Sequence, residues 1–347
     1  MADAPRPPRL SDATRHDDAT LLARAVPAVE GRRIAVVGDV ILDCYRSDGG
    51  RSHCFPGGAG VIAGHLRRLG AQPVLVTQLA NDGNARQLRR GLDDLGIEVH
   101  AVPTDAAQPV RTRRVQGHRI TATPRQELIE SPPPVTTGRI AGAITERRLD
   151  LDAVIFADFG HGTVTPELLD GVLPILRPST PVLTGDVSGP RASLLAMRKF
   201  DLLTPTEREL RRLSPSPSPL TPLDALGRRL VTELDLKHLL VTRDASGCVR
   251  YSSNGTKREQ PSLASMYQTR VFDEVGAGDA LLAAATLGLC SGLGIRSSVR
   301  LGQIAAAAAI AQIGNAAMGW ERLHRVIAPQ ATSAASYPAQ AASMPAA

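Results

Sequence analysis

Short runs of apolar residues alternate along this chain with longer stretches that have the periodicity of helices. Runs such as IAVV and AVIF contain no polar residue, which is typical of strands buried on both faces. Strands are predicted at residues 34–37, 73–77, 153–156, 182–184, 202–203 and 239–242. Helices are predicted at residues 60–69, 85–95, 166–176, 207–213, 223–232, 280–289 and 297–313. This alternation predicts an α/β fold, with a mostly parallel central sheet and helices on both of its faces.

The two ends of the chain lack this pattern. Residues 1–18 are rich in Pro, Arg and Asp, and residues 328–347 are largely Ala, Pro and Ser, so both segments are predicted to be disordered. Two interior stretches, residues 131–137 and 214–222, are rich in Pro, Ser and Thr and are predicted to be loops. Neither stretch is long enough to mark a domain boundary, so residues 19–327 are expected to form one domain.

Composition narrows the classes of function. Aromatic residues make up only 3% of the 347 residues, so the core is expected to consist of Leu, Val, Ile and Ala. The 40 Lys and Arg outnumber the 34 Asp and Glu, but they are spread along the chain. Nucleic-acid binding is therefore not favoured, because it needs clustered positive charge. No apolar run approaches ~18 residues and the N-terminal segment has no apolar core, so neither a membrane span nor a secretory signal is expected.

The four cysteines, Cys44, Cys54, Cys248 and Cys290, are scattered without CxxC spacing. This distribution argues against a zinc cluster and against a disulfide framework. It predicts reduced cysteines in a cytoplasmic protein.

The first predicted strand is followed by two carboxylates. Ligands of parallel sheets bind at the carboxyl ends of the strands, and Gly38 and Asp39 lie at such an end, with Asp43 four residues later. Two carboxylates there suit hydrogen bonds to several hydroxyls of a sugar or polyol. The alternative is a turn with an aspartate that caps a helix.

A glycine pair precedes the first predicted helix. Gly57 and Gly58 let the backbone approach a ligand closely and direct the amides of the helix N-terminus at it. Residues 58–63 also fit the dinucleotide fingerprint GxGxxA, but no predicted strand precedes them. An NAD-dependent dehydrogenase is therefore not favoured.

The most informative segment is VFDEVGAGD, residues 271–279, directly before an apolar helix. Gly276 and Gly278 bracket a turn whose amides predict an anion hole at the helix N-terminus. Asp279 within it is expected to accept the proton of a hydroxyl that attacks a transferring phosphoryl group. GxxxxGK[ST] is absent, so the segment is not a Walker P-loop. The alternative is an aspartate-capped helix after a glycine turn.

With these motifs in this order, the chain resembles the ribokinase-like (PfkB-type) carbohydrate kinases. The resemblance rests on the early GD, on PGGA with the following LRRLG, and on LLTPTEREL, LLVTRDASG and DEVGAGDALLAA, over about residues 30–325. GDVILDCY, TPTERE and LLVTR are most similar to the heptose 7-phosphate kinase domain of the bifunctional heptose enzyme. The resemblance implies a three-layer α/β/α sandwich with a β lid. It also implies an ATP-dependent kinase whose leading acceptor is the anomeric hydroxyl of a heptose 7-phosphate.

The resemblance implies roles for the residues that match the family motifs. The implied catalytic residues are Asp279 as the base and Gly276, Ala277 and Gly278 as the anion-hole amides. The implied acceptor-binding residues are Asp39, Asp43, Gly57, Gly58 and Arg113, the last toward a sugar phosphate. The implied cofactor-binding residues are Thr242, Gly247 and Glu209, the last orienting Mg²⁺ through water. The implied cofactors are ATP and Mg²⁺, with a monovalent cation as an additional candidate.

The chain also departs from the family pattern. The departures are Val61, Thr206 and Gln303 at asparagine positions, Val275 at a threonine position and His161 at a basic position. Only 13 residues, 44–56, separate Asp43 from Gly57. A strand pair is therefore expected to be missing from the lid, reduced within about residues 44–56 and 108–130, and a monomer or weak homodimer is expected. The departures support a second hypothesis, a catalytically impaired protein that binds sugar or nucleotide as a regulator.

Overall fold

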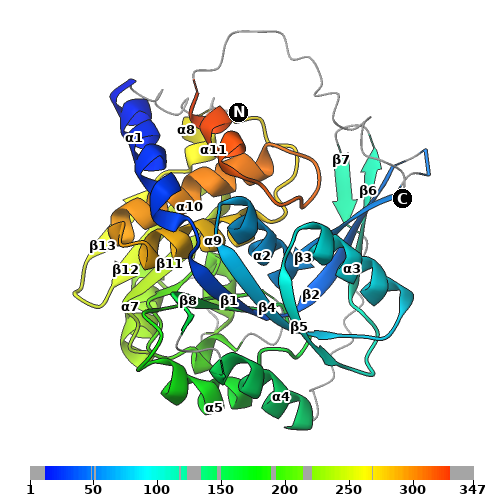
Figure 1. Cartoon of the computed structure of the whole chain (residues 1–347). Helices are drawn as coiled ribbons and strands as arrows, with labels where there is room; N and C mark the ends of the chain where they lie inside the picture. The colour runs from blue at the N-terminus through cyan, green and yellow to red at the C-terminus, as the bar shows by residue number, and fades with distance from the viewer. Residues whose placement is uncertain are drawn as a thin grey trace.

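A nine-stranded sheet forms the middle layer of the protein (Figure 1). The computed structural model describes residues 12–47, 49–50, 52–116, 119–122, 134–146, 150–188, 193–213, 221–267 and 269–328. The strands of this sheet are β1 (Arg33–Gly38), β4 (Gln72–Leu79), β5 (Glu98–Pro103), β8 (Ala153–Asp158), β9 (Val182–Val187), β10 (Leu202–Leu203), β11 (His238–Thr242), β12 (Cys248–Ser252) and β13 (Lys257–Gln260). Their order is β13-β12-β11-β10-β9-β8-β1-β4-β5. All neighbours from β11 to β5 are parallel, and β12 and β13 add an antiparallel edge.

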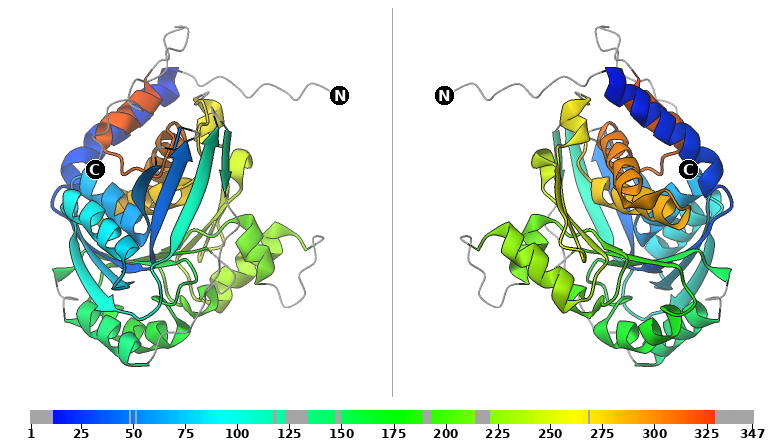
Figure 2. Two further views of the ribbon diagram at one scale, coloured as in Figure 1. Left: turned by 90° about the vertical axis from the view of Figure 1, so that its right-hand side faces the viewer. Right: turned by 90° about the vertical axis from the view of Figure 1, so that its left-hand side faces the viewer.

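Helices cover both faces of this sheet and complete the expected three layers (Figures 1 and 2). One face is covered by α1 (Asp12–Val29), α2 (Ala59–Arg68), α3 (Gly83–Asp94), α8 (Leu263–Met266), α9 (Ala277–Cys290), α10 (Gly294–Ile310) and α11 (Trp320–Ile327). The other is covered by α4 (Pro134–Thr145), α5 (Pro166–Leu176), α6 (Glu207–Arg212) and α7 (Leu223–Glu233). Alternate residues of β1 enter opposite cores: Ile34 and Val36 pack on the first face, Ala35 and Val37 on the second. The doubly buried strand predicted from IAVV is thereby confirmed.

A second sheet of four strands forms a lid at one side of the layered body (Figure 1). It consists of β2 (Val40–Ser47), β3 (Ser52–Gly58), β6 (Val110–Gln116) and β7 (Arg119–Ala122), in the order β3-β2-β6-β7. The sequence predicted the loss of a strand pair from the short 44–56 segment. In the structure this segment supplies the ends of both strands of the β2–β3 hairpin, within a lid of four strands.

The prediction that the cysteines are reduced is wrong for two of the four, which lie in the lid. Cys44 on β2 lies directly opposite Cys54 on β3, and the two form a disulfide. Ten positions separate them in the sequence, but the hairpin register brings their Cα atoms to 4.0 Å. Cys248 and Cys290 are free thiols, the first buried and the second half-buried.

The N-terminal segment is helical from Asp12, which corrects the prediction of disorder through residue 18. Helix α1 buries Leu22, Ala25 and Val29 against the core, and its Asp18 forms an ion pair with Arg300 of α10.

All four segments that the sequence predicts to be disordered or loops lie partly outside the described residues. The predicted loop at 131–137 overlaps α4, which begins at Pro134. Residues 1–11, 214–220 and 329–347, which include most of the other segments predicted to lack structure, lie outside the described residues. Among the described helices, none combines the length and the apolar content needed to cross a membrane.

Candidate active site

The predicted anion hole lies at the start of α9. Gly276 adopts a left-handed conformation with φ of 81°, which reverses the chain so that the helix begins at Ala277. A Cβ at Gly276 would lie 2.2 Å from Oδ1 of Asn315, so only glycine fits there. The first amides of a helix have no partner within the helix and attract anions. Helix α9 therefore begins at the turn where the sequence predicts the anion hole.

Asp279 lies in the first turn of α9 and is half-buried. Burial raises its pKa to about 7, the positive charge of Arg111 acts in the opposite direction, and the negative charge of Asp43 adds to the increase. Both of these side chains belong to the lid: Asp43 on β2 is the register neighbour of Arg111 on β6. The carboxylate of Asp279 is thus within electrostatic reach of the lid.

Asp186, at the carboxyl end of β9, belongs to the site but was missed from the sequence. Burial and the negative charges of Glu209 and Asp279 raise its pKa well above the ordinary value, and Oδ1 accepts a 3.2 Å hydrogen bond from the Thr204 hydroxyl. The signal was present, since Asp186 follows a predicted strand at the edge where ligands collect. Three carboxylates therefore meet between β9, α6 and α9.

Glu209 has a structural role in addition to its implied role of orienting Mg²⁺. Its Oε2 accepts hydrogen bonds from the amide and the hydroxyl of Thr206, both at 2.8 Å, and Thr206 Oγ1 accepts one from the Glu209 amide at 3.2 Å. This capping box starts α6, so the departure Thr206 has a local structural role.

The carboxylates of Asp186 and Glu209 fit a magnesium ion that is bound mainly by nucleotide. Within the described residues, no group of three or more His, Cys, Asp or Glu side chains is arranged to hold a metal ion. Mg²⁺ commonly keeps several waters and binds through one or two carboxylates together with substrate phosphates. Repulsion by Glu209 and Asp279 adds to the effect of burial in raising the pKa of Asp186, and a cation beside Asp186 would offset this repulsion.

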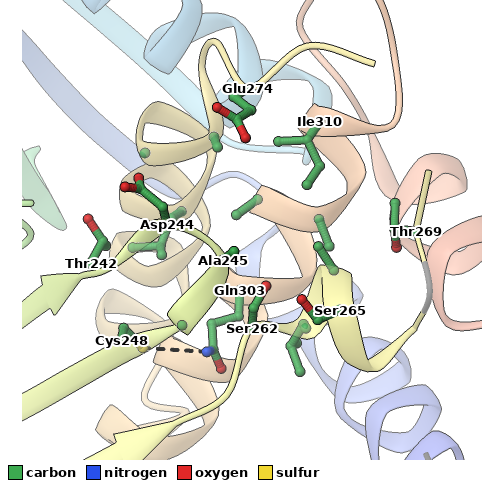
Figure 3. Close-up of a pocket in the computed structure, with 18 of the residues that line it drawn as sticks. Thr242, Asp244, Ala245, Cys248, Ser262, Ser265, Thr269, Glu274, Gln303 and Ile310 are labelled. Carbon is green, nitrogen blue, oxygen red and sulfur yellow. Dashed lines mark hydrogen bonds between the residues drawn. The ribbon is translucent and has the colours of Figure 1, made fainter. Parts of the chain in front are cut away.

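A cavity of about 600 Å³ lies beside the N-terminus of α9, between the β10–β12 edge, α8 and α10 (Figure 3). Thr242 and Gly247, the two residues implied for nucleotide binding, both line it, together with Ala277 and Gly278 of the anion hole. Apolar residues of α9 and α10, among them Leu281, supply much of its wall. The structure therefore brings the implied nucleotide residues and the anion hole together around one cavity.

The lid side of the site is polar and buried. Oδ2 of Asp43 accepts a hydrogen bond from Nδ2 of Asn315 at 3.0 Å, and Oδ1 lies 3.5 Å from Nη2 of Arg113. Burial raises the pKa of Asp43, whereas Arg113 and Arg111 act to lower it. Gly57 makes room for this carboxylate, because a Cβ there would lie 2.2 Å from Asp43 Oδ2. Asn315 follows α10, and no local motif of the sequence points to it.

Asp39 fixes a neighbouring loop. Its carboxylate accepts backbone hydrogen bonds from Phe159, His161 and Thr163 at 2.9, 3.0 and 2.8 Å. Gly58, with φ of 61°, passes so close that a Cβ would lie 2.4 Å from the Asp39 carbonyl oxygen. Asp39 and Gly58 therefore fix the backbone on the lid side of the site, and the carboxylate oxygens of Asp39 accept hydrogen bonds from backbone amides.

Three other residues that depart from the family pattern are also buried or hydrogen-bonded in the structure. Val61 is buried in α2, and the Val275 amide donates to Oδ1 of Asp273 at 3.1 Å. Gln303 donates from Nε2 to the Pro261 carbonyl at 3.3 Å and to Cys248 Sγ at 3.4 Å (Figure 3).

Comparison with known proteins finds a family model, curated relatives and solved structures that are similar to this chain. Residues 181–322 match the family model described as pfkB family carbohydrate kinase. The bifunctional protein HldE of Pelobacter propionicus is 27% identical over 300 residues, which cover 80% of this chain and 60% of that protein. The bifunctional protein HldE of Geobacter metallireducens is 28% identical over 302 residues, 80% of this chain and 59% of that protein. The chain thus spans about 60% of the length of these curated relatives.

Solved structures show the same fold. Phosphofructokinase-2 from Escherichia coli, in complex with substrates and products, aligns with a TM-score of 0.70 at 17% identity and covers 85% of this chain and 98% of its own. Ribokinase of Arabidopsis thaliana, complexed with ribose and ATP, aligns with a TM-score of 0.65 at 16% identity and covers 87% and 100%. These similarities confirm the predicted ribokinase-like fold.

Proposed function

We propose that this chain is a pfkB-type carbohydrate kinase and that it transfers the γ-phosphate of ATP to a hydroxyl of a sugar phosphate. Heptose 7-phosphate, through its anomeric hydroxyl, is the proposed acceptor. The heptose assignment rests on the similarity to the HldE proteins and on the basic lid residues described below.

One observation carries the proposal: Asp279 lies between the cavity and the lid. Its chain neighbours Ala277 and Gly278 line the cavity, and its own charge interacts with Asp43 and Arg111 of the lid. A nucleotide in the cavity would place its terminal phosphate at the 276–278 amides. An acceptor under the lid would place a hydroxyl at Asp279.

The proposed reaction needs a base and an anion hole, and Asp279 and the turn at 276–278 are the groups assigned to these roles. Asp279, with a pKa of about 7, is half ionised at neutral pH and takes the proton of the attacking hydroxyl. A bond forms between the acceptor oxygen and the γ-phosphorus while the bond to the bridging oxygen of ADP breaks. The amides at 276–278 stabilise the charge on the transferring phosphoryl group. Mg²⁺ near Asp186 and Glu209 would supply further charge neutralisation when bound with the nucleotide.

The basic residues of the lid favour an anionic acceptor. Arg111 lies next to Asp43 in the strand register, and its guanidinium carbon lies 5.8 Å from the centre of the Phe159 ring. Arg113, two residues along the same face of β6, is buried, and its Nε has no hydrogen-bond partner among the described residues. Guanidinium groups bind phosphate through paired hydrogen bonds, so these two side chains suit a sugar phosphate better than a neutral sugar.

The test is a phosphorylation assay with purified full-length protein, ATP and Mg²⁺. The acceptors are heptose 7-phosphate, fructose 6-phosphate, ribose and the unphosphorylated heptose, each in sodium and in potassium buffer. Asp279→Asn should lower the rate by ~10²–10⁴-fold. Asp94→Asn, at the exposed end of α3, is the matched control and should retain full activity.

Each outcome of this assay is decisive. Phosphorylation of heptose 7-phosphate by the wild type, with loss in Asp279→Asn, supports the proposal. Preference for a neutral sugar would overturn the acceptor assignment. Binding of ATP and sugar phosphate without turnover would instead identify the protein as a regulator.

A further inference from the structure

Strand β2 contacts the site at two positions, Asp43 and Tyr45, which share one face of the lid because side chains of a strand alternate. Asp43 is bound by Asn315, the residue that packs against the Gly276 turn. Tyr45 is buried, and its hydroxyl donates a 2.8 Å hydrogen bond to Oδ2 of Asp273. The proposed kinase mechanism assigns no role to Tyr45 or Asp273.

Asp273 organises the chain that leads into the anion hole. Its Oδ1 accepts a hydrogen bond from the Val275 amide at 3.1 Å, and its Oδ2 accepts one from the Gly314 amide at 3.3 Å. The same carboxylate therefore holds both the turn before Gly276 and the segment that carries Asn315. Because Asp273 is buried, the hydroxyl of Tyr45 is the donor that connects this arrangement to the lid.

The ring of Tyr45 is fixed on both sides. It lies edge to face with Phe55 of β3, with ring centres 5.8 Å apart, and the guanidinium carbon of Arg113 lies 5.7 Å from its centre. Burial raises the pKa of Tyr45 above its ordinary value, so the hydroxyl keeps its proton and remains a donor. A change of Tyr45 to phenylalanine would keep the ring contacts and remove only the hydrogen bond to Asp273.

We propose that Tyr45 is a positioning residue, which holds Asp273 so that the turn at 273–276 presents the anion-hole amides only while the lid strand is in place. This inference rests on the proposed kinase function. It makes the phosphate site depend on the strand that also carries Asp43. The hydroxyl of Tyr45 is directed at Asp273, so loss of this hydroxyl should reduce the rate of the assembled complex and leave acceptor affinity nearly unchanged.

Two measurements on Tyr45→Phe test this role. In steady-state kinetics, kcat should fall about 10-fold to 100-fold, the range expected for one hydrogen bond to a charged group, with KM for the acceptor within about twofold of wild type. In amide hydrogen exchange of the ligand-free protein, Val275 and Gly314 should exchange at least about 10-fold faster, because their acceptor is no longer held.

The matched control is Tyr251→Phe. Tyr251 on β12 is also buried and also donates to a carboxylate, Oδ1 of Asp224 at 2.9 Å, but it packs against α7, away from the lid. This variant should keep wild-type kcat and wild-type exchange at Val275 and Gly314. A global loss of stability would change both variants, whereas a positioning role changes Tyr45→Phe alone.

The outcomes separate this inference from the kinase proposal. If the wild type phosphorylates no acceptor, the kinase proposal fails, and the exchange rates still decide whether Tyr45 holds the turn. If the wild type is active and Tyr45→Phe keeps both its kcat and its exchange rates, the inference is overturned. A rise in KM with unchanged kcat and unchanged exchange overturns it as well, because Tyr45 would then act on acceptor binding.

Discussion

The rate of phosphoryl transfer should depend on pH through the ionisation of Asp279. Burial raises the pKa of this carboxyl to about 7, so the folded protein holds it protonated over a pH range where an exposed aspartate is ionised. A general base works only when ionised. We therefore expect kcat/KM to rise about tenfold per pH unit in acid and to level off above a midpoint near 7.

Two lid variants should move this midpoint in opposite directions. Arg111 lowers the pKa of Asp279, so Arg111→Gln should move the midpoint upward by about one pH unit, the lower end of the effect of a close opposite charge. Asp43 raises it, so Asp43→Asn should move the midpoint downward. Both variants should also weaken acceptor binding, which lowers the plateau without moving the midpoint.

The assay measures kcat/KM for the acceptor at constant ionic strength, with saturating ATP and Mg²⁺. The pH is varied from about 5.5 to about 9, roughly the span over which a base of pKa near 7 titrates. Asp279→Asn serves as the reference, since its residual activity should show no midpoint near 7. The reasoning is refuted if the wild-type midpoint lies near 4, or if Arg111→Gln and Asp43→Asn move it in the same direction.

Three further changes test separate parts of the structure. Gly57→Ala, whose Cβ would meet Asp43 Oδ2 at 2.2 Å, should weaken acceptor binding about 10-fold or more in calorimetry and leave ATP binding unchanged. Cys54→Ser removes the disulfide to Cys44 and should lower the free energy of unfolding by about 3 kcal/mol in urea titrations. A dithiol reductant should reproduce this loss in the wild type and have no effect on the variant. Asp39→Ala leaves the amides of Phe159, His161 and Thr163 without their acceptor and should lower the free energy of unfolding by about 3 kcal/mol or more, with a small change contradicting its role in the loop.

The central sheet could be predicted because its strands are buried on both faces. Continuous apolar runs such as IAVV have no other common explanation at that length, and β1, β4, β8 and β9 all extend the predicted segments. The lid strands lack this signal. β6 has the sequence VRTRRVQ, with charged residues on both faces, and only pairing with β2 makes it a strand.

Features that depend on the register of paired strands could not be predicted from the sequence. The disulfide joins cysteines ten residues apart, and nothing in their spacing shows that the β2–β3 hairpin places them opposite each other. Helix α1 differs, because Leu21, Ala25 and Val29 recur every four residues, a helical pattern that the prediction of disorder from the polar composition overlooked.

The candidate site likewise contains some residues that the sequence predicts and others that only the fold brings together. Gly276, Gly278 and Asp279 form a local motif whose chemistry follows from adjacent residues. Asp186 and Asn315 join the site only through the fold, Asp186 because β9 lies beside β10 and Asn315 because the chain after α10 returns to β2. Of these two, Asp186 follows a predicted strand, and a systematic search of strand ends would have included it.

The charges of the site give the two substrates an orientation. Asp186, Glu209 and Asp279 gather on the side proposed for the nucleotide phosphates, whereas Arg111 and Arg113 lie on the lid. A bare polyphosphate would be repelled by these carboxyl groups in their ionised form, so the nucleotide should enter with its metal ion, which offsets the local negative charge. The phosphate of an acceptor meets the opposite field and is drawn to the lid. Under the proposed function, the nucleotide with its metal ion therefore approaches from the carboxylate side, and the sugar phosphate approaches Asp279 from the lid side.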